Sequence, residues 1–174
     1  MIFNKRSDIH SLKPTIPALC RVAALILLLC VFFTGCSTSS GSMQDGYYTA
    51  IAEFFDDFGW KEYVTIYVSD NRIITVEYNA SNSSGFIKSW DMDYMRTMNA
   101  KDGTYPNKYT REYADALLNE QDPYMVDAIT GATHSYTSFQ MLAEAAITKA
   151  QNGDKTVAYV NIPPVQDSPA SAEE

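Results

Sequence analysis

The chain has 174 residues and a formal net charge of −8 at pH 7, with 13 lysine and arginine residues against 21 aspartate and glutamate residues. So acidic a chain lacks the basic surface that nucleic acid requires, and it is poorly matched to anionic lipid head groups. The acidity is interpreted as a contribution to solubility.

Residues 1–35 are typical of a secretion signal rather than of a folded domain. A basic start precedes the apolar run VAALILLLCVFF at 22–33, which as a helix rises about 18 Å and is too short to cross a hydrocarbon core of roughly 30 Å. The run ends in FTGC, which resembles the lipobox of bacterial lipoproteins with Phe33 in place of the usual leucine. The resemblance implies cleavage before Cys36 and lipid attachment to that cysteine. The alternatives are an ordinary signal peptide and a short uncleaved anchor.

Removal of this signal leaves Cys36 as the one cysteine and His134 as the one histidine. A disulfide, a cysteine-based metal site and a zinc site with several histidines are then excluded. Small polar residues predict a flexible tether at 36–44, and a segment rich in Pro, Ser, Ala and Glu predicts a disordered tail at 163–174. Between them, residues 45–162 suit a single domain.

The first half of this domain carries strand patterns. Residues 45–55 are compatible with a strand or a short helix, and the strand is preferred. Residues 63–80 alternate apolar and polar side chains on both sides of the sequence SDNR, which predicts a β-hairpin. One face of each strand is predicted to be buried. This face is formed before the turn by Val64, Ile66 and Val68, and after it by Ile74, Val76 and Tyr78.

The second half carries helix patterns at 91–99 and 110–121, and a clear amphipathic helix whose apolar positions recur from Phe139 to Ala150 and which ends near Gly153. Residues 156–162 are expected to add an edge strand. Strands followed by helices predict an α+β domain, a small antiparallel sheet with helices packed on one face.

The segment DAITGATHS, residues 127–135, carries the most specific signal. It resembles the flavinylation motif of the FMN-binding domain family, Asp-x-x-(Ser/Thr)-Gly-Ala-Thr-x-(Ser/Thr). The likeness extends over about residues 45–153, in the form of single-domain, membrane-anchored lipoproteins. The resemblance implies that a magnesium-dependent flavin transferase takes FAD and links FMN through its phosphate to Thr133. The other defined motif positions fall on Asp127, Thr130, Gly131, Ala132 and Ser135.

Local chemistry is compatible with this implication. A threonine hydroxyl is a weak nucleophile unless a base or metal activates it, which suits a residue modified by another enzyme. We expect Gly131 and Ala132 to leave room for that enzyme, the start of the helix near Thr133 to favour a phosphate, and Ser135 to cap a free N–H. Asp127 is expected to bind the transferase or to order the loop.

Further candidates are weaker. Trp90, Tyr94 and Tyr136 could stack on the isoalloxazine ring, although such residues more often complete a core. Lys88 could meet the phosphate or a reduced, anionic flavin, although lysine is usually a solvated surface residue. His134 adjoins the attachment point and is more simply interpreted as an exposed spacer.

The predicted function is that of a lipid-anchored electron carrier on the outer side of the cell membrane, with no catalytic residues of its own. Its expected partners are the flavin transferase and membrane NADH or quinone electron-transfer components. The alternative is a non-redox surface lipoprotein, an interaction or adhesin-like module, in which Thr133 is only a helix cap. A reductase that binds a small substrate beside the flavin is a third possibility.

Overall fold

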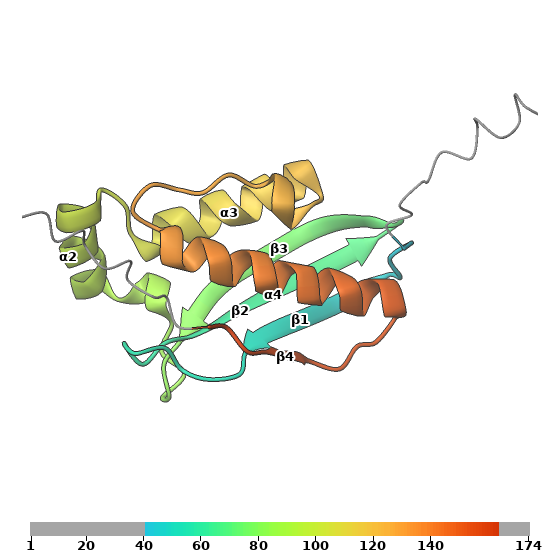
Figure 1. Cartoon of the computed structure of the whole chain (residues 1–174), viewed down its shortest axis with the longest axis horizontal. Coiled ribbons are helices and arrows are strands. Elements are labelled where there is room, and N and C mark those ends of the chain that lie inside the picture. The colour runs from blue at the N-terminus through green and yellow to red at the C-terminus, as the bar shows by residue number, and fades with distance from the viewer. Residues whose placement is uncertain (1–40, 164–174) are drawn as a thin grey trace, which may run out of the picture. The chain divides into compact units, whose positions relative to one another are not determined.

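A four-stranded sheet with strand order β3-β2-β1-β4 forms one layer of the domain (Figure 1). The structure, a computed structural model, describes residues 41–163. The strands are β1 (Gly46–Ala52), β2 (Lys61–Ser69), β3 (Arg72–Ser81) and β4 (Ala158–Val160). The helices are η1 (Lys88–Trp90), α2 (Met92–Asp102), α3 (Pro106–Glu120), η2 (Pro123–Met125) and α4 (Thr133–Asn152), of which η1 and η2 are 3₁₀ helices.

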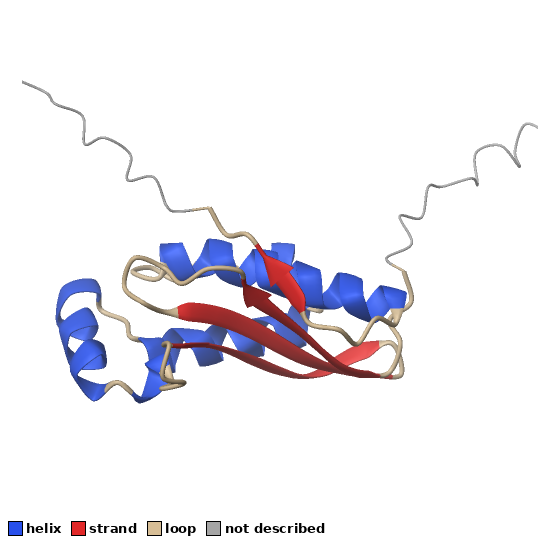
Figure 2. Cartoon of the chain, turned by 90° about the horizontal axis from the view of Figure 1, so that it is seen from below, coloured by secondary structure: helices blue, strands red, loops and turns tan. Residues whose placement is uncertain are grey.

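The sheet is mostly antiparallel. β2 pairs antiparallel with both β1 and β3, whereas the short edge strand β4 runs parallel to β1. The helices α3 and α4 cover the same face of this sheet (Figures 1 and 2). This confirms the predicted α+β class, with one parallel edge strand that the sequence did not indicate.

The β2–β3 hairpin turns at Asp70 and Asn71, whose φ angles of 52° and 61° are those of a type I′ turn. The predicted buried face is correct on β2 but shifts on β3. A register change opposite Tyr67 and Val68 places Ile73 in the core at 2% exposure and leaves Ile74 48% exposed. The prediction that Ile74 is buried was therefore wrong, because a β-bulge inserts one residue and breaks strict alternation.

The helix predictions hold with changes mainly at two boundaries, the first of which is the end of α2 at Asp102 rather than at residue 99. α3 begins at Pro106 rather than at residue 110, with proline in the first turn, where its missing N–H costs nothing. α4 begins at Thr133 and ends at Gly153 in the left-handed conformation, as its amphipathic pattern predicted. Its buried side chains, from Phe139 to Ala150, pack against the sheet core.

Aromatic rings fill the space between the sheet and the two long helices. Tyr78 of β3, Tyr113 of α3 and Phe139 of α4 are each at most 2% exposed. The ring centroids of Phe139 lie 5.1 Å from those of Tyr78 and Tyr113. These contacts fix the N-terminal half of α4 over β3 and α3.

The chain enters the domain at the C-terminal end of α4. The backbone N–H of Gln44 donates to the carbonyl of Ala150 at 2.9 Å, and Met43 packs against the core. Both residues belong to the segment predicted as a tether, whose earlier part lies outside the described residues together with the predicted signal peptide and nearly all of the predicted tail. Among residues 41–163, none of the helices combines the length and the apolar composition that a membrane span requires.

Candidate functional site

The segment before α4 makes a tight turn that needs glycine. The N–H of Ala132 donates to the carbonyl of Ile129 at 2.9 Å, and Gly131 has a φ of 81°. A Cβ at this position would lie 2.4 Å from the backbone oxygen of Asp102 and 3.1 Å from Cγ2 of Thr104. The loop thus rests directly on the α2–α3 connection.

This contact changes the expected roles of the Gly-Ala pair. Gly131 provides a left-handed turn and a close backbone approach, and Ala132 is 3% exposed within the core. Both small residues are required by packing inside the domain, so room for an external enzyme does not explain them. The exposed residue is the next one in the chain, Thr133.

Thr133 is the first residue of α4 and is exposed. Ala132 occupies the N-cap position without any side-chain capping bond, and the first intrahelical bond runs from Tyr136 N to Ala132 O at 3.0 Å. Within the described residues, the Thr133 hydroxyl and the N–H groups of residues 133–135 have no hydrogen-bond partner. Thr133 therefore does not cap the helix, and the interpretation of this residue as a cap was wrong.

Ser135 turns inward instead of capping an N–H. Its side chain is buried, and its hydroxyl donates to a carboxylate oxygen of Glu62 at 3.3 Å. The hydroxyl of Tyr78 lies 3.1 Å from the same carboxylate and 2.9 Å from the carbonyl of Ser135. Hydrogen bonds through Glu62 and Tyr78 therefore connect the first turn of α4 to β2 and β3.

The electrostatics of Glu62 follow from this position. Burial of the carboxylate raises its pKa, while the positive charge of Lys88 and hydrogen bonds from serine and tyrosine hydroxyls oppose that rise. Burial and the neighbouring Glu62 also raise the pKa of Tyr78 well above its ordinary value, so this phenol stays protonated as a donor.

Lys88 is the charged partner of this network and is only 6% exposed. Its Nζ lies 5.9 Å from the ring centroid of Trp60 and 5.3 Å from that of Tyr94. No hydrogen bond or ion pair to the ammonium occurs within residues 41–163, so it is held by two aromatic faces and by the field of Glu62. Lys88 is therefore not the fully solvated surface lysine of the simpler expectation, since most of its side chain is buried beside two aromatic rings.

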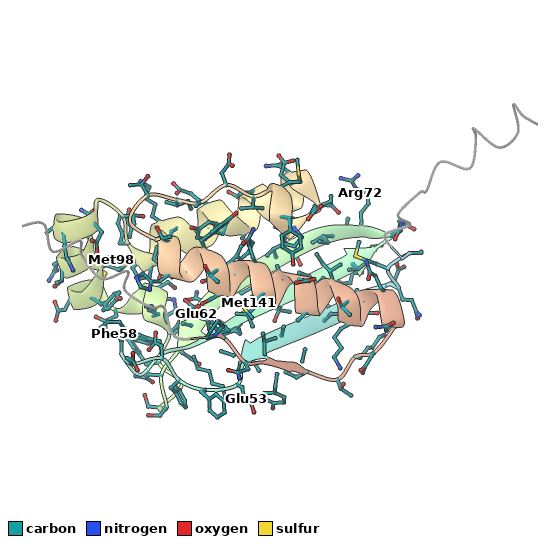
Figure 3. The ribbon with its side chains drawn as sticks, in the orientation of Figure 1. Glu53, Phe58, Glu62, Arg72, Met98 and Met141 are labelled. Atoms are coloured by element: carbon teal, nitrogen blue, oxygen red, sulfur yellow. The ribbon has the colours of Figure 1, made fainter. Side chains whose placement is uncertain are left out.

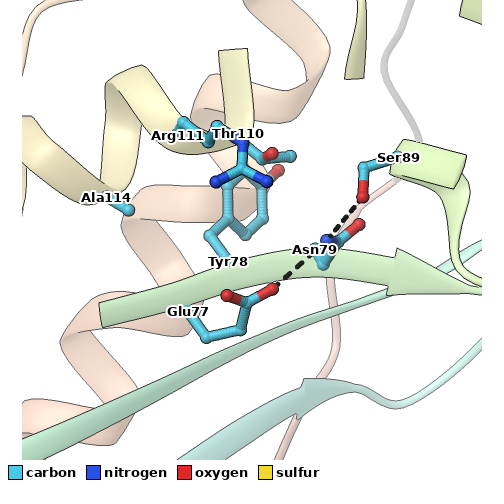
Figure 4. A pocket seen from close by; sticks show the side chains of 7 residues that line it. All are labelled: Glu77, Tyr78, Asn79, Ser89, Thr110, Arg111 and Ala114. Atoms are coloured by element: carbon cyan, nitrogen blue, oxygen red, sulfur yellow. Dashed lines mark hydrogen bonds between the residues drawn. The ribbon is translucent and has the colours of Figure 1, made fainter. Parts of the chain in front are cut away.

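The position of Lys88 is set by its neighbour Ser89. Asn79 of β3 donates to the hydroxyl of Ser89 at 2.9 Å and also to Glu77, which ties η1 to the sheet. Figure 4 shows these two bonds beside a cavity of about 40 Å³ between β3 and α3. This cavity is large enough for a water molecule but not for a cofactor.

The aromatic candidates divide into two groups. Tyr136 donates its hydroxyl to the carbonyl of Val126 at 2.8 Å and packs against Tyr113, so it belongs to the core rim. Trp90 is 65% exposed and Tyr94 is partly buried against Trp60. Only these two remain available to a planar ligand.

The remaining predicted residues are exposed. The side chains of Thr130, Asp127 and His134 are exposed. None of these three side chains makes a hydrogen bond within residues 41–163. A loop-ordering role for Asp127 has no contact to support it, which leaves its proposed interaction with another protein. The described residues contain no cluster of His, Cys, Asp and Glu suited to a metal ion.

The fold and these contacts define a small α+β domain with a candidate anion site at the start of its longest helix. Residues 59–148 match the FMN-binding domain family, and the chain belongs to this family. It is similar to the 15 kDa lipoprotein of Treponema pallidum (strain Nichols), with 40% identity over 74% of this chain and 90% of that protein. It is also similar to the crystal structure of the CPE2226 protein from Clostridium perfringens, with a TM-score of 0.67 and 34% identity over 70% of this chain and 99% of the other.

Proposed function

We propose that the chain is a lipid-anchored electron carrier outside the cytoplasm, with FMN joined through its phosphate to Thr133. The observation that carries the proposal is the free hydroxyl of Thr133 at the start of α4, surrounded by unpaired backbone N–H groups. A helix start of this kind attracts an anion both by its dipole and by direct hydrogen bonds. Membership of the FMN-binding domain family supports FMN as the occupant.

The residues near Thr133 fit such a group. The free N–H groups of residues 133–135 suit phosphate oxygens, and the unpaired ammonium of Lys88 suits a negatively charged part of the flavin. Trp90 and Tyr94 offer aromatic surface for a planar ring. The flavin supplies the redox chemistry, and the protein supplies position and electrostatics.

Attachment requires a separate enzyme. The oxygen of Thr133 forms a bond to the phosphorus of the FMN half of FAD, the P–O–P bond of FAD breaks, and AMP leaves. The hydroxyl proton passes to a base on the transferase, because no carboxylate or imidazole in the described residues is bonded to Thr133 Oγ1. Asp127, exposed six residues earlier, is assigned to contact with that transferase or its magnesium.

Anchoring follows from the lipobox-like FTGC sequence and from the lipoprotein relative. Cys36 carries the lipid and holds the domain on the extracytoplasmic side of a membrane. Covalent attachment keeps the flavin in a compartment where a lost cofactor could not be replaced. Electrons arrive from a membrane NADH or quinone system and leave to a separate acceptor.

One mass measurement tests both modifications. The full chain, coexpressed with a flavin transferase and purified in detergent, should have the mass of a chain that starts at Cys36 and bears acyl groups and one FMN. Thr133→Ala should lose the FMN mass and the in-gel flavin fluorescence completely while keeping the acyl mass. Its fold should be unchanged, since this exposed hydroxyl makes no intramolecular bond.

Matched controls are available on the same turn and helix. Thr130→Ala and Thr137→Ala remove other exposed hydroxyls, and both should keep the flavin. Retention of FMN by Thr133→Ala, or a wild-type chain without flavin, would contradict the proposal. A Cys36→Ala chain that still gains acyl mass would contradict the anchor alone.

A further inference from the structure

The connection between β1 and β2 exposes three aromatic side chains. In residues 53–59, here named the phenylalanine loop, Phe54 is 65% exposed, Phe55 48% and Phe58 78%. Phe58 has the largest exposed fraction among the exposed large hydrophobic residues of the described chain. Apolar side chains gathered on one loop in this way mark an interaction surface rather than a random feature of the exterior.

Hydrogen bonds hold this loop in one conformation. One carboxylate oxygen of Asp56 accepts from the N–H of Phe58 at 2.9 Å and from the N–H of Trp60 at 2.7 Å. The backbone of Asp56 also bonds to Trp60 O and Gly59 N. Because the phenylalanines are presented by an ordered loop, little conformational entropy is lost when they are covered by a partner.

The phenylalanine loop lies at the Thr133 end of the domain. It leads directly into Trp60, whose ring faces Lys88, and into Glu62, which is bonded to Ser135 of the first turn of α4. Figure 3 shows Phe58 and Glu62 at one end of the domain and Arg72 at the other. A surface next to the flavin attachment point is where a redox partner must approach.

The chain enters at the opposite end of α4. Gln44 is bonded to Ala150, and Ala150 lies 17 residues after Thr133 on one continuous helix, or about 25 Å along its axis. A lipid attached before Gln44 therefore joins the domain at the end that is remote from the phenylalanine loop.

Charge identifies the class of occupant. The phenylalanine loop contains Glu53, Asp56 and Asp57, which outnumber the basic side chain of Lys61, whose Nζ lies 5.5 Å from the ring centroid of Phe55. Three carboxylates among the phenylalanines oppose insertion into a membrane, especially an anionic one. They complement a protein surface on which basic side chains surround an apolar hollow.

We propose that the phenylalanine loop is the docking surface for the electron-transfer partner, a protein with a basic rim around an apolar patch. The inference depends on the proposed function, because it assigns a partner to a flavin on Thr133. Phe58 is the central anchor of this surface, and the carboxylates steer the encounter.

The test uses the full flavinylated chain in detergent, reduced chemically and mixed with a basic c-type cytochrome as the probe. The reduced flavin, FMNH2, loses two electrons and two protons; two ferric haems each gain one electron, and the protons pass to the buffer. Phe58→Ser should lower the second-order rate constant about tenfold, whereas Tyr47→Ser, which alters a 65% exposed aromatic residue at the far end of β1, should change it less than about twofold. Asp57→Asn should weaken the dependence of the rate on salt.

Two readouts separate the possible failures. The mass added by FMN and the rate of ferricyanide reduction should be the same in wild type and both serine variants, so a loss of either points to the flavin site and not to docking. If these are normal and Phe58→Ser reacts with the cytochrome as fast as wild type, the docking surface is overturned. Phe54→Ser provides a second variant should Phe58→Ser prove unstable.

Membrane docking predicts a different result. The full chain is placed in vesicles of brominated phosphatidylcholine, and fluorescence is measured from its two tryptophans, of which Trp60 adjoins the phenylalanine loop. We expect no quenching by the bromine atoms. Strong quenching that disappears in Phe58→Ser would show that lipid covers the loop and would overturn the proposal.

Discussion

The two ends of α4 are finished in opposite ways. At the C-terminal end, Gly153 adopts a left-handed conformation, its N–H donates to Ala150 O, and the N–H of Asp154 donates to Lys149 O. The Lys149 ammonium then bonds to Asp154 and to Thr156. At the N-terminal end no side chain caps the helix, and Thr133 projects into solvent. We call the C-terminal end of α4, which is capped and lies where the chain enters, the closed end. The uncapped N-terminal end, which carries the motif, is the open end.

This difference separates a helix end that is completed by the fold from one whose backbone N–H groups the fold leaves unpaired. A side-chain cap contributes about 0.5–2 kcal/mol to helix stability. A threonine at position 132, the N-cap, could supply it. The domain instead places a buried alanine at the N-cap and holds the first turn through Ser135 and Glu62. The free N–H groups remain available to an external anion.

Replacement of the turn glycine should produce the largest loss of stability at the open end. Gly131→Ala places a methyl group 2.4 Å from the Asp102 carbonyl in addition to imposing a left-handed φ. We expect the free energy of unfolding to fall by about 3–5 kcal/mol, measured by urea denaturation followed by circular dichroism.

Gly85 separates the two contributions. Its φ of 82° matches that of Gly131, but nothing lies within 4 Å of a Cβ built there. Gly85→Ala should therefore cost only about 1–2 kcal/mol, the price of the backbone conformation. Equal losses in the two variants would show that the contact with Asp102 is unimportant.

Lys88 and Glu62, beneath the open end, should give the next largest effect. Lys88→Met removes the positive charge that offsets the burial of Glu62, and at neutral pH we expect a loss of about 2–3 kcal/mol. This is below the roughly 3–5 kcal/mol of a broken buried ion pair, because the two groups make no direct ion pair and Glu62 keeps some exposure. A raised carboxyl pKa means that the folded state holds the proton more tightly than the unfolded chain. The contribution of Glu62 to stability is then fully present at low pH and is lost as the pH rises from about 4.5 through the raised pKa.

The double variant Lys88→Met/Glu62→Gln checks this sign. Without the carboxylate, the fall in stability between pH 4.5 and 8 should largely disappear, and the two substitutions should not be additive. Urea denaturation over this pH range measures both quantities. If the stability of the single variant Lys88→Met did not change over this pH range, the electrostatic coupling between Lys88 and Glu62 would be contradicted.

The sequence predicts the elements better than it predicts their side-chain partners. The hairpin, α4 and its two boundaries follow from local periodicity and glycine chemistry, which depend on neighbouring residues. The shift at Ile74 does not, because a bulge depends on how β3 meets β2. The clash that makes Gly131 necessary also involves a residue, Asp102, that lies far away in the sequence.

The site shows the same limit. Thr133 could be proposed from the sequence because a contiguous motif surrounds it, whereas Glu62 was missed although a signal was present. Its even-numbered position puts it on the same strand face as Val64 and Ile66, both fully buried. A carboxylate on that face must find partners, but Tyr78, Lys88 and Ser135 come from three separate segments, and only the folded domain brings them together.

An effect as small as that of Gly85→Ala is expected at the closed end of α4. Gly153 has a φ of 65°, similar to that of Gly131, and a Cβ there would meet the Gln44 side chain at 2.4–2.5 Å. A glutamine side chain can rotate away, whereas the Asp102 carbonyl is backbone and cannot. Gly153→Ala should therefore cost about 1–2 kcal/mol, like Gly85→Ala and unlike Gly131→Ala. It should also leave flavin loading unchanged by intact mass, because Thr133 lies about 30 Å away along the helix. A loss of flavin in Gly153→Ala would show that the two ends are coupled and that the helix does not separate anchoring from cofactor attachment.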